Sequence, residues 1–145
     1  MYYHILLALI GLAGFCIASY ISHCKNKKKP LVCPLRTSCD FVTTSDYSKF
    51  LGIHIEHIGM AYYAIVTLLH FSIVFFPEFA TFPVLLAGLT ASSCAFLFSL
   101  YLTAIQAFVL KQWCTWCITS AVLCALIFVT TYLSWTGAPI LSFLW

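Results

Sequence analysis

Four long apolar stretches constrain the fold of this chain more than any other feature. None of them contains Lys, Arg, Asp or Glu, and a helix needs about 20 apolar residues to cross the core of a bilayer. In lipid, a helix pairs its own backbone polar groups internally, so helices are the expected form of such stretches. The stretches predict transmembrane helices over about 2–22, 58–76, 83–110 and 113–135.

The composition supports a membrane protein. Only 8% of the residues are charged, whereas soluble domains carry roughly 25%. The first stretch lacks a basic start and exceeds the usual apolar core of a signal peptide, about 7–15 residues, so we expect a retained helix. The short links between the later stretches make neighbouring helices antiparallel. We predict an all-α membrane protein with one domain, residues 1–145.

Residues 23–57 form a polar segment between the first two predicted helices. They hold six of the seven Lys and Arg residues, three of the four acids and three cysteines. Within this segment, Thr43–Leu51 predicts a short helix on the membrane surface, with Thr44 or Ser45 as its N-cap and Gly52 as its stop. The segment is therefore predicted to be a loop that caps one end of a four-helix bundle.

Two pairs of cysteines are the candidate chemistry. Cys33 and Cys39 lie in the capping loop, and Cys114 and Cys117 form a C-x-x-C at the head of the fourth helix, on the same side of the membrane. Residues three apart share a helix face, where their Cα separation suits a disulfide. A helix N-terminus also favours a thiolate. The pattern indicates a disulfide-exchange relay, with a lipid-soluble quinone as the electron acceptor.

Other interpretations of the cysteines remain open. A zinc site with four cysteine ligands suits the C-x-x-C, but the spacing of Cys33 and Cys39 suits it poorly, since zinc ligands are usually two to four residues apart. Two purely structural disulfides are the other alternative. We expect no metal. Cys24 lacks an evident mate and is interpreted as structural, and three cysteines are interpreted as packing within helices: Cys16, Cys94 and Cys124.

An ordered set of short motifs resembles the vitamin K epoxide reductase family. The set begins with Cys33 and "SCD" at Cys39, continues through "TTSDYSKFLGI" and "IGMAYY", and ends at "CTWCIT". The resemblance implies a four-helix bundle that encloses a quinone beneath the capping loop. The other bacterial four-helix disulfide-forming family is disfavoured, because there the C-x-x-C precedes the second pair.

The resemblance also implies roles for individual residues. Cys33 would meet the partner's thiols, Cys39 would pass the disulfide between the loop and Cys114, and Cys117 would lie nearest the quinone. Ser45 would help to hold the cap. The residues that would line or shape the quinone pocket are Thr43, Tyr47, Gly59, Tyr63 and Ala121.

The chain departs from the animal enzymes at two points in the pocket. Ala121 stands where they carry a tyrosine, and Ile55 aligns with the asparagine that holds their quinone oxygen, with Glu56 and His57 beside it. Either neighbour is a hypothetical proton donor or hydrogen-bond partner for the quinone, although solvation at the membrane surface is the simpler explanation of both.

These departures favour the microbial role of the family. The predicted function is a membrane thiol–disulfide oxidoreductase that oxidises a thioredoxin-like partner and reduces a quinone of the ubiquinone, menaquinone or vitamin K type, with vitamin K epoxide as a further candidate substrate. Because no thioredoxin-like sequence follows Trp145, we expect the partner to be a separate chain. The alternative is a non-catalytic membrane assembly or transport protein with structural disulfides.

The predicted orientation rests on two conflicting arguments. All seven Lys and Arg residues lie on the cysteine side, which the positive-inside rule would place in the cytoplasm. Disulfide chemistry requires an oxidising compartment, such as the periplasm or the lumen of the endoplasmic reticulum. We predict that the cysteine side faces that compartment.

Overall fold

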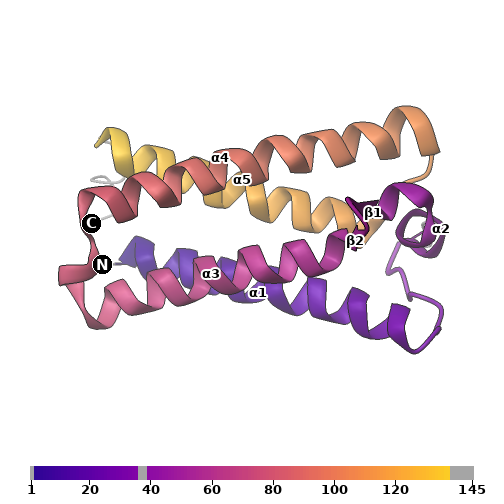
Figure 1. Cartoon of the computed structure of the whole chain (residues 1–145), viewed down its shortest axis with the longest axis horizontal. Helices are drawn as coiled ribbons and strands as arrows, with labels where there is room; N and C mark the ends of the chain where they lie inside the picture. The colour runs from indigo at the N-terminus through magenta and orange to yellow at the C-terminus, as the bar shows by residue number, and fades with distance from the viewer. Residues whose placement is uncertain (1, 36–38, 138–145) are drawn as a thin grey trace.

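Four long helices make up most of the computed structural model, which describes residues 2–35 and 39–137. They are α1 (Tyr2–Asn26), α3 (Ile55–Phe75), α4 (Phe82–Ala104) and α5 (Thr115–Thr136), and α4 continues as a π-helix, η3 (Ile105–Leu110) (Figure 1). Within the described part of the chain, all four crossings are long and apolar enough to span a membrane. The predicted all-α four-helix fold is confirmed.

Two helices extend further into the polar segment than predicted. α1 runs on to Asn26 and carries His23 and Lys25 in its last turn, while α3 begins at Ile55 with Glu56 in its first turn. Positive charge at a helix C-terminus and negative charge at an N-terminus stabilise the helix dipole. Lys25 and Glu56 therefore favour helix ends beyond the apolar stretches.

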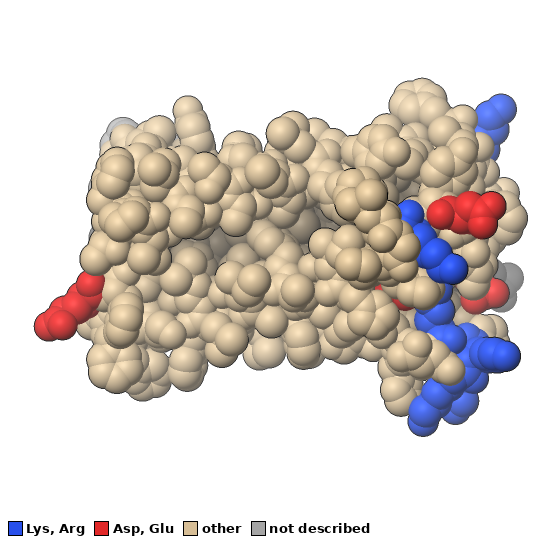
Figure 2. All heavy atoms as spheres, viewed as in Figure 1, with Lys and Arg blue, Asp and Glu red and all other residues tan. Residues whose placement is uncertain are grey.

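The helices associate as two antiparallel pairs. α1 packs along α3 and α4 packs along α5, and α1 also contacts α5, so that the pairs lie one above the other in Figure 1. Within the described residues, no comparable packing joins α3 to α4. Figure 2 shows the molecular surface hollowed along the line where these two helices face each other. The bundle is therefore open toward lipid on this side.

The capping loop is built differently from its prediction. A helix over Thr43–Leu51 is wrong: the structure has α2 (Cys39–Thr44), the short 3-10 helix η1 (Asp46–Ser48), and an antiparallel hairpin of β1 (Lys49–Phe50) and β2 (Ile53–His54). The hydroxyl of Thr44 donates to the Asp40 carbonyl at 2.7 Å, and that of Ser45 donates to the Val42 carbonyl at 2.7 Å. Hydroxyl groups that bond local carbonyls compete with helix continuation, so α2 ends here.

The hairpin explains Gly52, which is a turn residue and not a helix stop. Leu51 and Gly52 have φ of 51° and 82°, and two consecutive positive φ values are the requirement of a tight hairpin turn. Phe50 then lies against Phe98 of α4, with ring centroids 5.4 Å apart. The hairpin thus fixes the cap to the bundle.

Tyr63 joins three helices in the centre of the bundle. It is 1% exposed, and a Cβ at Gly14 of α1 would overlap its ring. Its hydroxyl donates to the backbone carbonyl of Ser120 in α5 at 2.8 Å. The close approach of α1 and α3 therefore depends on a glycine, and α5 is held by the same tyrosine. The chain passes from α3 to α4 at the far end through η2 (Pro77–Phe79).

Candidate redox site

The structure brings together the four cysteines that the sequence singled out. Cys39 and Cys114 are fully buried in one cluster, and Cys33 and Cys117 pack against it. Cys33 and Cys39 form a disulfide, with Cα atoms 6.2 Å apart, while Cys114 and Cys117 are free thiols. Contacts between α2 and α5 join the loop pair to the C-x-x-C pair. Both pairs therefore lie at one edge of the bundle.

The start of α5 supports a thiolate at Cys114. Cys114 is the N-cap of this helix, and its sulfur accepts a hydrogen bond from the backbone N–H of Cys117 at 3.3 Å. A hydrogen bond from the Cys117 thiol lowers the pKa of Cys114 below the ordinary value, and the backbone N–H groups of Cys117 and Trp116 lower it further, although burial acts in the opposite direction. The lower-pKa thiol is the better nucleophile near neutral pH.

The two loop cysteines differ in access to water. Cys33 is partly exposed, whereas Cys39 has no exposed surface. The indole N–H of Trp116 in α5 donates to the carbonyl of Val32 at 2.9 Å, so the loop is fastened to α5 next to Cys33. An outside reagent therefore meets Cys33 first, and Cys39 faces the interior.

A cavity of about 400 Å³ lies beneath this cluster and is enclosed by α1, α3, α4 and α5, with α2 and η1 above it. Cys117 is part of its wall. All five residues that the family resemblance placed at a quinone pocket also line it: Thr43, Tyr47, Gly59, Tyr63 and Ala121.

Two of these five residues have hydroxyl groups that are already engaged within the protein. Tyr63 bonds the carbonyl and the hydroxyl of Ser120, each at 2.8 Å, and the sulfur of Cys124 at 3.2 Å. The Thr43 hydroxyl donates to the Cys39 carbonyl at 2.9 Å. Gly59 leaves room, since an added Cβ would have only an ordinary 3.9 Å contact with Ala18. Thr43, Gly59 and Tyr63 therefore shape the wall and aim no free polar group into it.

Other polar side chains in the wall escaped the sequence analysis. Gln106 is 5% exposed, lines the cavity, and accepts the Cys114 backbone N–H at 3.3 Å. It is the only amide side chain in its apolar stretch, and a polar residue inside a membrane span is a signal of function. Tyr62 also lines the cavity, and among the described residues its buried hydroxyl has no hydrogen-bond partner.

The Glu56 side chain is likewise part of the cavity wall, whereas His57 is exposed and outside it. The Glu56 carboxylate pairs with the Lys25 ammonium at 3.1 Å, and the side chain is 7% exposed. Simple solvation at the membrane surface therefore describes His57 but not Glu56.

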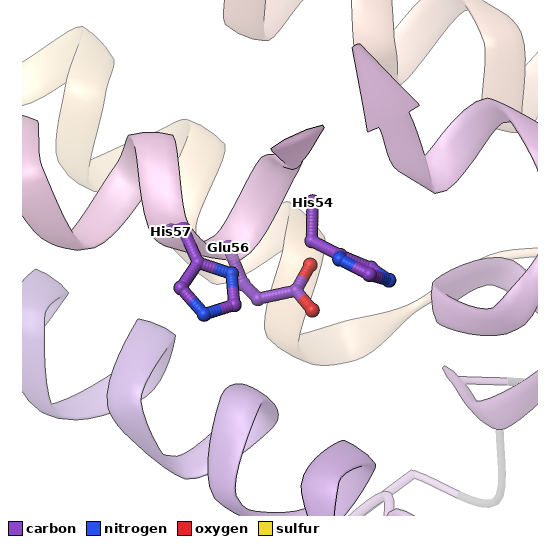
Figure 3. A group of neighbouring side chains, drawn as sticks. All are labelled: His54, Glu56 and His57. Atoms are coloured by element: carbon purple, nitrogen blue, oxygen red, sulfur yellow. The ribbon is translucent and has the colours of Figure 1, made fainter. Parts of the chain in front are cut away.

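Glu56 and two neighbouring histidines have the donor atoms of a metal site. His54, Glu56 and His57 bring one nitrogen or oxygen each within 4.8 Å of one another (Figure 3). The Lys25 ammonium already binds the carboxylate and would repel a cation there. We therefore assign no metal to this group.

The cavity suits a quinone. Its volume is within the range of about 300–1,000 Å³ of sites for small organic ligands, which are mostly apolar with a few placed polar groups. The side open between α3 and α4 leads to lipid. A ring with an apolar tail can therefore enter the cavity from the membrane.

The remaining cysteines divide into three kinds. Cys24 is buried in the same cluster as Cys39 and Cys114. Cys94 and Cys124 line the cavity, and Cys16 is exposed on the outer surface of α1. Cys24 thus packs against the redox cluster, a proximity that its sequence position did not indicate.

Comparisons with known proteins agree with this geometry. Curated protein sequences yield no significant match. The sequence profile of the vitamin K epoxide reductase family matches residues 5–132. This range includes the capping loop, the C-x-x-C and all four helices, apart from the first turn of α1 and the last turn of α5. The chain therefore belongs to the vitamin K epoxide reductase family, whose members are membrane disulfide oxidoreductases.

Proposed function

We propose that this protein oxidises the dithiol of a thioredoxin-like partner and delivers the electrons to a quinone in the membrane. The observation that carries the proposal is the single cluster that holds all four cysteines, from partly exposed Cys33 to Cys117 in the cavity wall. A non-catalytic assembly would have no need of a free dithiol beside an apolar cavity.

The loop pair performs the first exchange. A partner thiolate attacks the sulfur of Cys33, because Cys39 is buried, and the second partner thiol then completes the partner's disulfide. Cys33 and Cys39 are left as thiols, so one disulfide is broken and one is formed. The Cys39 thiolate then attacks a Cys114–Cys117 disulfide at Cys114, its neighbour in the cluster, and releases the Cys117 thiolate. Cys33 attacks Cys39 in turn, which re-forms the loop disulfide and frees Cys114.

The inner pair, Cys114 and Cys117, then faces the quinone that accepts the electrons. In the structure the loop cysteines are bonded to each other, whereas Cys114 and Cys117 are free. Cys117 presents its sulfur to the cavity, and the lowered pKa of Cys114 keeps that thiol ready to close the disulfide. A bound quinone accepts two electrons and two protons.

The pocket favours reduction of a quinone over reduction of an epoxide. Ala121 lines the cavity and has no hydroxyl to donate to a substrate oxygen. We propose ubiquinone, menaquinone or a vitamin K quinone as the acceptor, and an assay with vitamin K epoxide in place of the quinone tests the distinction directly.

The proposed site lies on the oxidising side of the membrane. The proposed disulfide exchange supports this orientation, since disulfides persist in such compartments. The Lys residues at the same end (Figure 2) favour the opposite orientation. Labelling of Cys33 in intact, reduced cells with a membrane-impermeant maleimide decides between them, and absence of labelling would reverse the assignment.

The central experiment measures quinone reduction by the purified protein. Cys117→Ala abolishes reduction with any thiol donor, whereas Cys16→Ala, the control on the outer surface, leaves it unchanged. Cys33→Ala stops turnover with a thioredoxin-like protein but retains turnover with dithiothreitol, which is small enough to reach the inner pair. Quinone reduction by Cys117→Ala would overturn the proposal.

A further inference from the structure

An ion pair between Lys25 and Glu56 lies at the water-side end of the cavity. The two charged groups are 3.1 Å apart, and their side chains are only 18% and 7% exposed. Removing each ion from water costs several kcal/mol, which the attraction between the ions repays only in good geometry. An ion pair kept next to an apolar cavity is therefore a candidate for function.

The pair connects α1, η1 and α3 around the cavity. The Lys25 ammonium also donates to the hydroxyl of Ser48 at 3.3 Å, and both Ser48 and Glu56 belong to the cavity wall. Cys117 lines the same cavity. The carboxylate is thus held by a cation on one side and borders the proposed quinone on the other.

Two histidines link the carboxylate to water. Figure 3 shows the Glu56 carboxylate extending between the imidazoles of His54 and His57. Atoms of the three side chains that can exchange protons lie within 4.8 Å of one another, with His54 partly buried and His57 exposed. One bridging water between neighbouring atoms would complete a proton route from bulk water to the nearly buried carboxylate.

The proposed reaction creates a need for such a group. Oxidation of the inner dithiol breaks two S–H bonds, forms one S–S bond and releases two electrons and two protons. The electrons enter the quinone, and its two carbonyl oxygens each gain one proton. The Cys114 thiol, whose pKa is lowered, gives up its proton before the electrons move. A proton must then be returned to the quinone inside the cavity.

We propose that Glu56 is the catalytic residue that exchanges protons with an oxygen of the bound quinone, with Lys25 as its positioning residue and His54 and His57 as its link to water. The two thiol protons lost and the two quinone O–H bonds gained balance, so Glu56 returns to its starting state. This inference rests on the proposed function and assigns the proton path of the same site.

The first test compares Glu56→Gln with Glu78→Gln. Gln keeps the shape and hydrogen bonding of Glu but cannot transfer a proton, and Glu78 is an exposed glutamate in η2 at the opposite end of the bundle. Since acid–base groups contribute about 10²–10⁴-fold, we expect kcat for quinone reduction to fall at least about 100-fold in Glu56→Gln and to stay unchanged in Glu78→Gln. Quinone binding, measured as the ligand-induced rise in melting temperature, should be retained. An unchanged kcat, or a raised KM with kcat intact, would overturn the proposal.

The second test reverses the ion pair. Lys25→Glu combined with Glu56→Lys restores the attraction but moves the carboxylate to α1. We expect the melting temperature to recover from that of Lys25→Glu alone, while kcat remains low; Glu56→Asp, which keeps a carboxyl on α3, should recover part of the activity. Recovery of kcat in the reversed pair would show a purely structural ion pair and refute the proton-exchange role. Failure of the unchanged protein to reduce quinone would instead refute the proposed function itself.

Discussion

Replacing Tyr63 by Phe tests whether its hydroxyl stabilises the fold or binds the quinone. The family resemblance placed Tyr63 at the quinone, yet its hydroxyl bonds Ser120 twice at 2.8 Å and Cys124 at 3.2 Å. Side-chain hydrogen bonds inside membranes contribute about 0.6 kcal/mol on average, so the loss of three costs about 1–2 kcal/mol. That free energy corresponds to a change of roughly 5–30-fold in the folded-to-unfolded ratio.

The adjacent Tyr62 provides the matched control. Its hydroxyl is buried near Ser92 of α4 and makes none of the short hydrogen bonds that Tyr63 makes, so Tyr62→Phe should cost the ligand-free protein less stability than Tyr63→Phe. Equilibrium unfolding in mixed micelles of increasing dodecyl sulfate content measures the stability, and steady-state kinetics give KM for the quinone. We expect Tyr63→Phe to lower stability with little change in KM. A Tyr63→Phe variant of full stability with a strongly raised KM would show that the hydroxyl faces the ligand.

Three further outcomes follow from the packing and the site. Gly14→Ala should destabilise the protein by about 1–3 kcal/mol through overpacking, whereas Gly59→Ala, which has room for a Cβ, should not; thermal melting of both variants measures the difference. Trp116→Phe removes the hydrogen bond to Val32 and should loosen the loop by about 0.5–1.5 kcal/mol, seen as slower partner turnover but normal turnover with dithiothreitol. In the reduced protein, the thiolate absorbance of Cys114 should persist below the pH at which ordinary cysteines protonate and be lost as pH falls through its lowered pKa; titration only at the ordinary pH would contradict this environment.

Much of the architecture could be predicted because it follows from local rules. Uncharged stretches of membrane-spanning length identified four helices, and an even number of crossings between the loop and the C-x-x-C placed both cysteine pairs on one side. The short helix in the cap was misplaced, because the hydroxyl–carbonyl bonds that end α2 at Thr44 compete with helix formation in a way that propensity alone does not show.

The roles of polar residues in the cavity depended on contacts between distant parts of the chain. Lys25 looked like the water-side end of a helix, yet it pairs with Glu56, 31 residues away in the sequence, at the cavity wall. Tyr62 and Tyr63 are neighbours in the sequence with identical side chains, but one hydroxyl is engaged by α5 and the other is not.

The sequence by itself determined that this protein lies in a membrane, how many times it crosses the bilayer, and that its sulfur chemistry lies at one membrane surface. Hydrophobic length and cysteine spacing are local properties of the chain. Only the tertiary structure decided which side chains enclose the cavity, which polar groups are already engaged, and that α3 and α4 leave an opening toward lipid. Those properties arise from how helix faces meet, and one rotation of a helix would exchange a wall residue for a lipid-facing one.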